Sequence, residues 1–287
     1  MNRNLFFPTA ILLCLGMILS TGCRKLVHQN IQAASNGSLA LRSFNDVFIQ
    51  INRSVSSEMA LDEMTSANWN LQGSLCATVN LNPVGTGFPK TLTIDYGTGC
   101  TGPEGVTRKG KIIVVFSGNF RAEGTTMEVT LDGYSTGQYS LTGTYDIAND
   151  GLNGSGQPLF GEVVSNATIS WGTQMVAWEA ELTRTWIEGD TTNYSTPDTT
   201  SIMGFAGLND DVFTLSGTAV GNDSNTHPFT LETTNAVVLP ASCKYITEGM
   251  LVISPVNFNA GTVDYGMGDC DKRATIEVDG EVFNFTQ

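Results

Sequence analysis

The sequence predicts a mainly β protein: a repetitive antiparallel meander, folded as a twisted sheet or a β-sandwich, with one N-terminal amphipathic helix. Three observations support this class. Charged residues make up only 15% of the 287 residues and glycine contributes 31 of them, a composition that suits β-rich proteins outside the cytoplasm better than helical bundles. Apolar and polar residues alternate along many segments, and several of these segments occur twice. The net charge of −14 argues against nucleic acids and anionic lipid surfaces as partners.

Residues 1–22 have the features of an export signal. Arg3 precedes an apolar stretch, residues 5–19, that is too short to span a bilayer comfortably, since about 20 residues are needed. Residues 20–23, Ser-Thr-Gly-Cys, resemble the lipobox of bacterial lipoproteins, although Ser20 stands where that family usually has leucine. The resemblance implies cleavage before Cys23, acylation of Cys23 and a stable lipid anchor. The alternative is an ordinary signal peptidase site, with Cys23 left as a free thiol.

The residues after Cys23 bear on location. Arg24 stands where lipoproteins retained in the enterobacterial inner membrane have aspartate, and residues 24–27 lack the lysine-plus-acidic signal for surface export in Bacteroidetes. These resemblances imply a lipid-anchored protein of the outer membrane, on its periplasmic face.

A helix is predicted over residues 38–64, after a lipidated tether over residues 23–37. Six apolar residues recur at the i, i+3, i+4, i+7 spacing of an amphipathic helix: Phe44, Val47, Phe48, Ile51, Val55 and Met59. The opposite face carries polar residues: Arg42, Asn45, Arg53 and Ser57. We expect the apolar face to pack on the sheet.

Residues 65–287 are predicted to form a single duplicated antiparallel β domain. Met127, Val129 and Leu131 alternate with polar residues, and residues 139–147 do the same. Such alternation is typical of antiparallel strands with one face buried and one face in water. Residues 112–116 are apolar throughout, so we expect this strand to be covered on both faces, with the helix as the cover.

The cysteines agree with export. After the signal is removed and Cys23 is acylated, four remain: Cys76, Cys100, Cys243 and Cys270. An even number in an oxidising compartment predicts two disulfides, with three pairings open. An internal repeat selects one pairing, because residues 94–100 match residues 263–270 with one insertion, and each copy has an earlier cysteine at a similar distance. We therefore predict Cys76–Cys100 and Cys243–Cys270. A metal site of four thiolates is the alternative, but the sequence lacks CxxC spacing.

A second repeat supports one integrated domain. Residues 139–144 match residues 213–218, and the segments that contain Asn166 and Asn235 match in turn, which predicts repeated hairpins. The order of the modules (cysteine module, hairpin, hairpin, cysteine module) favours one domain over two separable halves. This arrangement resembles an uncharacterised Bacteroidetes-type family of β-rich lipoproteins. The resemblance implies no catalytic residue and no ligand.

One pair of carboxylates is a candidate for catalysis. Glu179 and Glu181 share a strand face at a spacing of roughly 7 Å, near the separation of the two acids in inverting glycosidases. Trp171, Trp178 and Trp186 could stack on sugar rings. The favoured interpretation is structural: the acids lie on the face in water, and the opposite face with Trp178 and Trp186 forms core. Arg184 on that face would then have to pair or reach solvent.

Three further features have a structural and a functional interpretation. The Asp-Tyr-Gly turns with nearby basic residues could bind an anion, but tight turns explain their glycines. The basic residues are Lys109, Lys111, Lys272 and Arg273.

Residues 122–242 hold 15 acidic residues and one basic residue, so calcium around residues 209–211 is an alternative to a solvated acidic face. Residues 188–201 read as an exposed Ser/Thr-rich loop, in which Thr191 and Thr199 resemble Bacteroides-type O-glycosylation sites.

The function predicted from these features is that of a lipid-anchored cell-envelope protein, a non-enzymatic structural or interaction module. A small-ligand or glycan-binding lipoprotein is the alternative, and a glycoside hydrolase is a remote one. His28 and His227 lie in no motif, and no nucleophile motif is present. We expect no cofactor and no metal, the membrane as a partner through the lipid anchor, an envelope protein or glycan as a candidate partner, and no nucleic acid.

Overall fold

The computed structural model describes residues 12–55, 61, 68–70, 76–102, 104–191 and 209–287; the side chains of residues 12–26 and 68–70 lie outside this description. One helix, α1 (Leu12–Val55), precedes the strands. The strands are β1 (Asn68–Asn70), β2 (Thr78–Asn82), β3 (Lys90–Asp95), β4 (Cys100–Thr101), β5 (Thr107–Phe116), β6 (Thr126–Thr136), β7 (Tyr139–Leu152), β8 (Pro158–Trp171), β9 (Gln174–Glu188), β10 (Val212–Asp223), β11 (Pro228–Pro240), β12 (Glu248–Pro255), β13 (Gly261–Met267), β14 (Arg273–Val278) and β15 (Glu281–Thr286).

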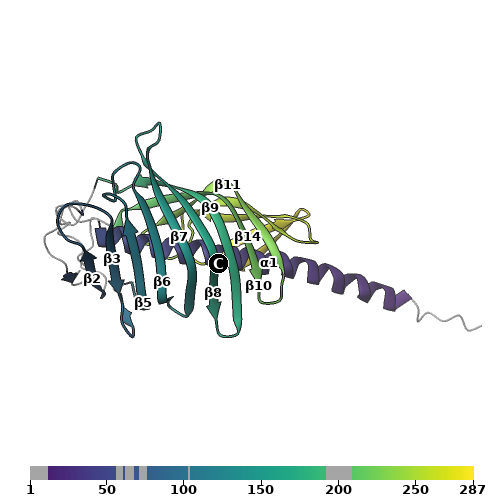
Figure 1. Ribbon diagram of the computed structural model, residues 1–287. Coiled ribbons are helices and arrows are strands. Elements are labelled where there is room, and N and C mark those ends of the chain that lie inside the picture. Colours follow the sequence, from purple (N-terminus) through teal and green to yellow (C-terminus); the bar gives the residue numbers. More distant parts are fainter. Residues whose placement is uncertain (1–11, 56–60, 62–67, 71–75, 103, 192–208) are drawn as a thin grey trace, which may run out of the picture.

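The strands belong to one open antiparallel sheet (Figure 1). Each strand pairs with the next along the chain, except that β3 pairs with β5 and the short β4 is a branch on β5. The predicted meander is confirmed, and of its two versions the twisted single sheet is present. Among the described residues, no helix is both long and apolar enough to cross a membrane.

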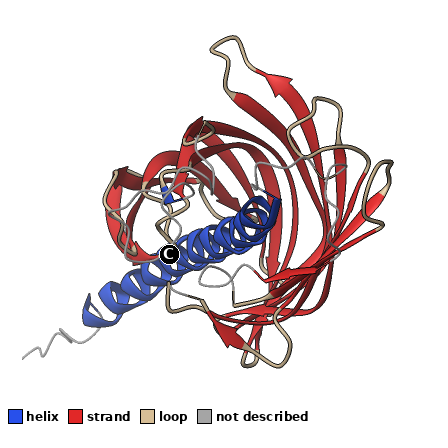
Figure 2. Cartoon of the chain, turned by 90° about the vertical axis from the view of Figure 1, so that its left-hand side faces the viewer, coloured by secondary structure: helices blue, strands red, loops and turns tan. Residues whose placement is uncertain are grey.

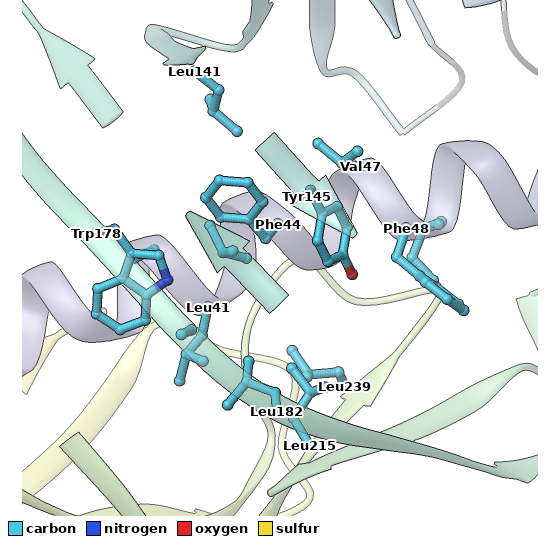
Figure 3. Close-up of a cluster of buried hydrophobic side chains, with 14 of the residues drawn as sticks. Leu41, Phe44, Val47, Phe48, Leu141, Tyr145, Trp178, Leu182, Leu215 and Leu239 are labelled. Carbon is cyan, nitrogen blue, oxygen red and sulfur yellow. The ribbon is translucent and has the colours of Figure 1, made fainter. Parts of the chain in front are cut away.

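Helix α1 lies along the concave side of the curved sheet (Figure 2). Its side chains Phe44, Val47, Phe48 and Ile51 are buried, and the ring of Phe44 meets Tyr145 of β7 edge-on at 5.5 Å between centroids (Figure 3). Burying one such side chain stabilises the fold by about 1.5–3 kcal/mol. The predicted apolar face is therefore confirmed, and packing against the sheet holds the helix in place.

The structure differs from the predicted tether over residues 23–37 and from the predicted helix start at residue 38. Helix α1 runs unbroken from Leu12, and Asn30, Ala33 and Ala34 are buried. The amide of Asn30 donates to the carbonyl of Asn259 at 2.8 Å. Ala33 and Ala34 are small, and a Cβ on nearby Gly37 would lie 3.0 Å from the side chain of Leu231. The helix therefore approaches the sheet closely here without the large apolar side chains that reveal a helical period. The helix ends at Val55, and most of the predicted extension to residue 64 falls outside the described residues.

Both predicted disulfides, Cys76–Cys100 and Cys243–Cys270, are confirmed. The first joins the segment before β2 to β4, and the second joins the β11–β12 connection to the β13–β14 connection. In the chain-entropy model, loops of this length contribute about 3 kcal/mol each.

The duplicated Asp-Tyr-Gly turns fasten the helix at two places. The carboxylate of Asp95 accepts a hydrogen bond from the backbone N–H of Gly97 at 2.8 Å, and Asp264 does the same for Gly266 at 2.8 Å. The tyrosine between them points inward in both copies. Tyr96 donates to the side chain of Gln50 at 3.1 Å, and the Tyr265 hydroxyl lies 2.7 Å from that of Ser38. The repeat therefore encodes a helix contact.

The second repeat encodes bends in the sheet. Gly143 of β7 and Gly217 of β10 have φ angles of 113° and 140°, values that L side chains rarely adopt. A Cβ on Gly143 would lie 2.5 Å from the backbone of Ala167, and one on Gly217 would lie 2.2 Å from the carbonyl of Glu181. The strand register shifts at both positions. Such bulges increase twist, so they help the sheet to curve around the helix.

The expectation that residues 112–116 are covered on both faces is wrong. Ile112, Val114 and Phe116 are fully buried on the inner face, whereas Ile113 and Val115 are only partly buried on the outer face. The helix covers the inner face of a single-layer sheet, and the outer face lies toward solvent.

Candidate functional site

A groove of about 590 Å³ opens along helix α1, between the β4–β7 part of the sheet and the β11–β12 connection. The helix forms its floor with polar side chains between Leu39 and Arg53. One wall comes from residues 104–108 and the β6–β7 turn, and the other from residues 240–245 of the β11–β12 connection. The groove size falls within the ordinary range for small-molecule sites.

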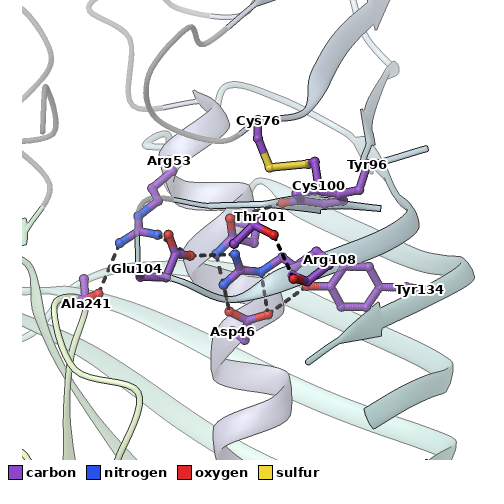
Figure 4. Close-up of polar contacts among 12 residues, drawn as sticks. Asp46, Arg53, Cys76, Tyr96, Cys100, Thr101, Glu104, Arg108, Tyr134 and Ala241 are labelled. Carbon is purple, nitrogen blue, oxygen red and sulfur yellow. Dashed lines mark hydrogen bonds and ion pairs between the residues drawn. A yellow bond between two sulfur atoms is a disulfide. The ribbon is translucent and has the colours of Figure 1, made fainter. Parts of the chain in front are cut away.

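An ion pair between Asp46 and Arg108 lies at the groove floor (Figure 4). The Arg108 Nε donates to Oδ2 of Asp46 at 3.1 Å, and the hydroxyl of Tyr134 donates to the same oxygen at 2.7 Å. Burial alone would raise the pKa of Asp46, but the charge and hydrogen bonds of Arg108, with help from Tyr134 and Thr136, hold it below its usual value. Burial likewise opposes the charge on Arg108, yet Asp46 raises the pKa of Arg108 above its ordinary value. Both groups are therefore kept ionised.

Glu104 extends this pair into a network that joins both walls. Its Oε1 accepts a hydrogen bond from Arg108 at 2.5 Å and lies 3.7 Å from Nη1 of Arg53. Arg53 in turn donates to the carbonyl of Ala241 at 3.2 Å, across the groove (Figure 4). Arg53 and Arg108 thus have carboxylate partners.

Two other cations at the groove lack such partners among the residues that the structure describes. Arg42 on the helix donates to the carbonyl of Lys244 at 3.3 Å, and its guanidinium lies 5.3 Å from the ring centroid of Tyr245. The ammonium of Lys244 lies 5.2 Å from the same ring. Within the described part of the chain, neither Arg42 nor Lys244 has a carboxylate within 4.0 Å. Burial lowers the pKa of Arg42, partly offset by Tyr139, Tyr245 and Tyr265.

A second buried ion pair holds the middle of the helix. Arg184 of β9 pairs through two nitrogens with both carboxylate oxygens of Glu162 on β8, and its Nη1 donates to Asn45 of the helix at 2.7 Å. The guanidinium lies 4.0 Å from the ring centroid of Phe48. The prediction that Arg184 must pair or reach solvent is resolved in favour of pairing.

A buried carboxyl group contacts the C-terminal part of the helix. Oδ2 of Asp211 accepts a hydrogen bond from Asn52 at 2.8 Å, and the Asp211 side chain is inaccessible to solvent. Burial raises the pKa of Asp211 to about 8, although the Asn52 hydrogen bond opposes the change. Asp211 faces the helix, so the suggestion of calcium around residues 209–211 finds no support in its orientation.

We expect Asp211 to make the protein less stable as the pH rises from 6 to 8. Its folded-state pKa of about 8 lies above the unfolded value of about 3.9, so folding favours the protonated form. The contribution of Asp211 to the free energy of unfolding is fully present below about pH 4 and is lost as the pH rises through 8. Between pH 6 and pH 8 the free energy of unfolding should fall by about 2 kcal/mol. Urea melts at both pH values measure it. Asp211→Asn should remove this pH dependence, whereas the control Asp132→Asn, at an exposed position, should keep it. If wild type and Asp211→Asn show equal pH dependence, Asp211 is not its source.

The predicted carboxylate pair lies on the outer face of the sheet. Glu179 and Glu181 are exposed on β9, whereas Trp178 and Trp186 on the same strand are buried on the opposite face. Trp171 is partly buried and its ring meets Tyr139 edge-on at 5.7 Å. The prediction that the two acids lie on the face in water and the two tryptophans in the core is therefore confirmed. The acids and the two buried tryptophans cannot bind the same sugar.

The remaining sequence candidates lie apart from the groove floor. Lys111 pairs with Asp95 at 3.5 Å and Arg273 with Asp271 at 2.6 Å, while Lys109 and Lys272 are exposed. No group of three or more His, Cys, Asp and Glu side chains in the described ranges could hold a metal ion. Thr191 is exposed in a turn; Thr199 and the side chain of Cys23 lie outside the described residues. His28 is exposed on the helix, and His227 lies 3.1 Å from Asp223.

Sequence reasoning missed the groove because its residues are dispersed along the chain. Arg42 and Arg53 are predicted on the polar face of the helix, and that face does line the opening of the sheet. Asp46 carries no motif, and Arg108 is visible only as part of a basic cluster after a cysteine. The signal that could have revealed the groove is the carboxylate of Asp46, which lies among the polar residues of the helix.

Comparison with protein-family models, with curated proteins and with solved structures finds no match to this chain. The functional assignment therefore depends on the geometry of the groove.

Proposed function

We propose that this protein is a lipid-anchored, non-enzymatic cell-envelope protein that binds a partner or small ligand in the groove along helix α1. The observation that carries the proposal is the pair of cations Arg42 and Lys244, which have no carboxylate partner among the described residues and lie beside the ion-paired Arg53 and Arg108 in a groove of ligand size. This favours a binding module over a purely structural one. A glycoside hydrolase remains the remote alternative.

The chemistry of the groove favours binding over catalysis. A general acid or base works best with a pKa near the operating pH. The pKa of Asp46 is held below its usual value. Tyr96 and Tyr134 do not line the groove themselves but bond to its residues Gln50 and Asp46, and burial raises the pKa of both tyrosines above the usual value. Each shift moves the group away from neutrality. Asp211, whose pKa does approach neutrality, is not among the residues that line the groove.

The N-terminal end of helix α1, which contains Cys23, projects away from the sheet, as a lipid anchor close to the sheet would require. Helix α1 extends beyond the sheet at its N-terminal end (Figure 1), and Asn30 is buried and bonded to Asn259. Seven residues separate Cys23 from Asn30, a rise of ~10 Å in a helix. An acyl group on Cys23 would therefore hold the sheet close to the membrane.

Cys23→Ala is expected to move the protein from the membrane fraction to the soluble periplasmic fraction, because the residue that carries the lipid is lost. Immunoblotting of fractionated cells measures the change. Cys14→Ala is the matched control, since Cys14 would be removed with the signal, and it should leave the protein in the membrane fraction. A Cys23→Ala protein that stays in the membrane with unchanged mobility would refute the anchor.

The released Cys23→Ala protein also tests the binding role. Material bound to it after purification from its own cells should be identifiable by mass spectrometry. Adding Ser242→Trp, which fills the exposed rim of the groove, should remove that material, whereas Thr130→Trp on the outer face of β6 should not. Retention by the Ser242→Trp protein would refute the groove as the binding surface.

A further inference from the structure

The distribution of charge around the groove differs from that of the rest of the protein. The whole chain has 14 basic and 28 acidic residues. Four of the basic residues line the groove, namely Arg42, Arg53, Arg108 and Lys244, against two acidic side chains, Asp46 and Glu104. The charged side chains of the groove are therefore net positive in a strongly acidic protein. A cleft of one sign of charge concentrates ligands of the opposite sign.

Arg42 has hydrogen-bonding capacity left over. A guanidinium carries five N–H donors, and the contact with the Lys244 carbonyl at 3.3 Å engages one nitrogen. The Nε of Arg42 is buried and meets no acceptor within the described residues. A carboxylate or phosphate can satisfy two N–H groups of a guanidinium at once. The Nη N–H groups of Arg42 that the Lys244 carbonyl does not engage are thus the donors offered to an oxyanion in the groove.

The surroundings of Arg42 make an uncompensated charge costly. Removal of a cation from water disfavours the charged form unless an anion lies nearby. Here burial lowers the pKa of Arg42, and the groups that partly offset it are tyrosines. A bound anion would supply the missing countercharge.

Aromatic rings stand beside these cations. The ring of Tyr245 has Arg42 at 5.3 Å and Lys244 at 5.2 Å from its centroid. Tyr139 lines the groove at the start of β7, and its ring meets that of Trp171 edge-on. Such rings offer apolar area with little loss of side-chain freedom. They suit a ligand with a ring or hydrocarbon portion next to its charge.

We propose that the groove binds a small organic anion, with a carboxylate or phosphate between Arg42 and Lys244 and its apolar portion against Tyr245 and Tyr139. This inference rests on the proposed binding function and names its ligand class. The oxyanion is shared by carboxylic acids, phosphate monoesters and acidic sugars.

The test is calorimetric titration of the Cys23→Ala protein with four probes: benzoate, phenyl phosphate, glucuronate and uncharged benzyl alcohol. At least one anion should bind and benzyl alcohol should bind at least tenfold more weakly; the preferred anion identifies the source of the oxyanion. Arg42→Gln, which removes the charge, should raise the Kd of that anion at least tenfold, and Arg42→Lys should raise it less. Lys109→Gln removes an exposed lysine that does not line the groove and should leave the Kd unchanged.

Three results would overturn the inference: no binding of any anion at millimolar concentration, equal binding of benzoate and benzyl alcohol, or an unchanged Kd in folded Arg42→Gln. If Arg42→Gln does not fold, as judged by circular dichroism, Lys244→Gln at an exposed position replaces it with the same expectation. Failure here with bound material still lost in Ser242→Trp would leave the groove as a site for a neutral ligand. Retention of that material in Ser242→Trp would instead refute the proposed function itself.

Discussion

Replacement of Arg184 by methionine is expected to lower the free energy of unfolding by about 3–5 kcal/mol, the cost of leaving a buried charge without its partner. The Arg184 side chain has no exposed area and that of Glu162 is 1% exposed. The substitution also removes the hydrogen bond to Asn45 and the stacking on Phe48. Urea melts monitored by tryptophan fluorescence measure the change.

A double variant separates the ion pair from simple packing. Arg184→Met with Glu162→Leu should recover much of the loss, because two apolar side chains can replace a buried ion pair. Lys111→Met, which breaks an exposed pair with Asp95 (side chains 42% and 37% exposed), is the matched control and should change stability by less than about 1 kcal/mol. If Arg184→Met costs no more than Lys111→Met, the pair is not desolvated in the folded protein.

Trp178→Ala should cost about 3–5 kcal/mol, the range for truncation of a buried large side chain. Trp178 is 1% exposed, and its ring centroid lies 6.4 Å from that of Phe229 on β11. The loss combines transfer of the indole from water with the cavity that remains. The same urea melts report it, through the remaining tryptophans.

The neighbouring acid supplies the control. Glu179→Gln alters the next residue on the same strand, on the exposed face, and should change stability by no more than about 0.5 kcal/mol. The pair of variants therefore measures the difference between the two faces of β9. A harmless Trp178→Ala would mean that the tryptophan face is accessible, and the glycan-binding alternative would then gain support.

Local patterns in the sequence predicted the features that depend on neighbouring residues. Alternation on β6, β7 and β9 predicted which face is buried, and the duplicated turns predicted the disulfide pairing. The helical period identified the part of α1 around Phe48. It missed the part around Ala33 and Gly37, where close approach of the helix to the sheet requires small residues. Periodicity detects large apolar side chains, so a tightly packed segment of small residues resembles a linker.

The groove depends on curvature, which local patterns do not encode. Asp46 meets Arg108 and Asn45 meets Arg184 only because the sheet wraps around the helix. In the sequence, these partners lie on separate elements with no shared motif. The bulges that help to bend the sheet were visible as repeated Leu-Thr-Gly-Thr and Leu-Ser-Gly-Thr segments, yet a repeated glycine does not state the direction or the extent of a bend. The apolar run of β5 likewise does not show that the sheet is a single layer around the helix, so the prediction that both faces of β5 are covered was wrong.

The threading of α1 along the sheet has a consequence for the order of folding. Adjacent strands of a meander can pair as soon as each hairpin is complete, since their contacts are local. The helix instead makes hydrogen bonds with residues that lie 46, 139, 159, 227 and 229 positions further along the chain. Its first partners are made early in synthesis, and its last is Thr286 of β15, whose carbonyl accepts a hydrogen bond from Ser35. The first element to be synthesised therefore cannot be fully enclosed until the last strand of the sheet has been made.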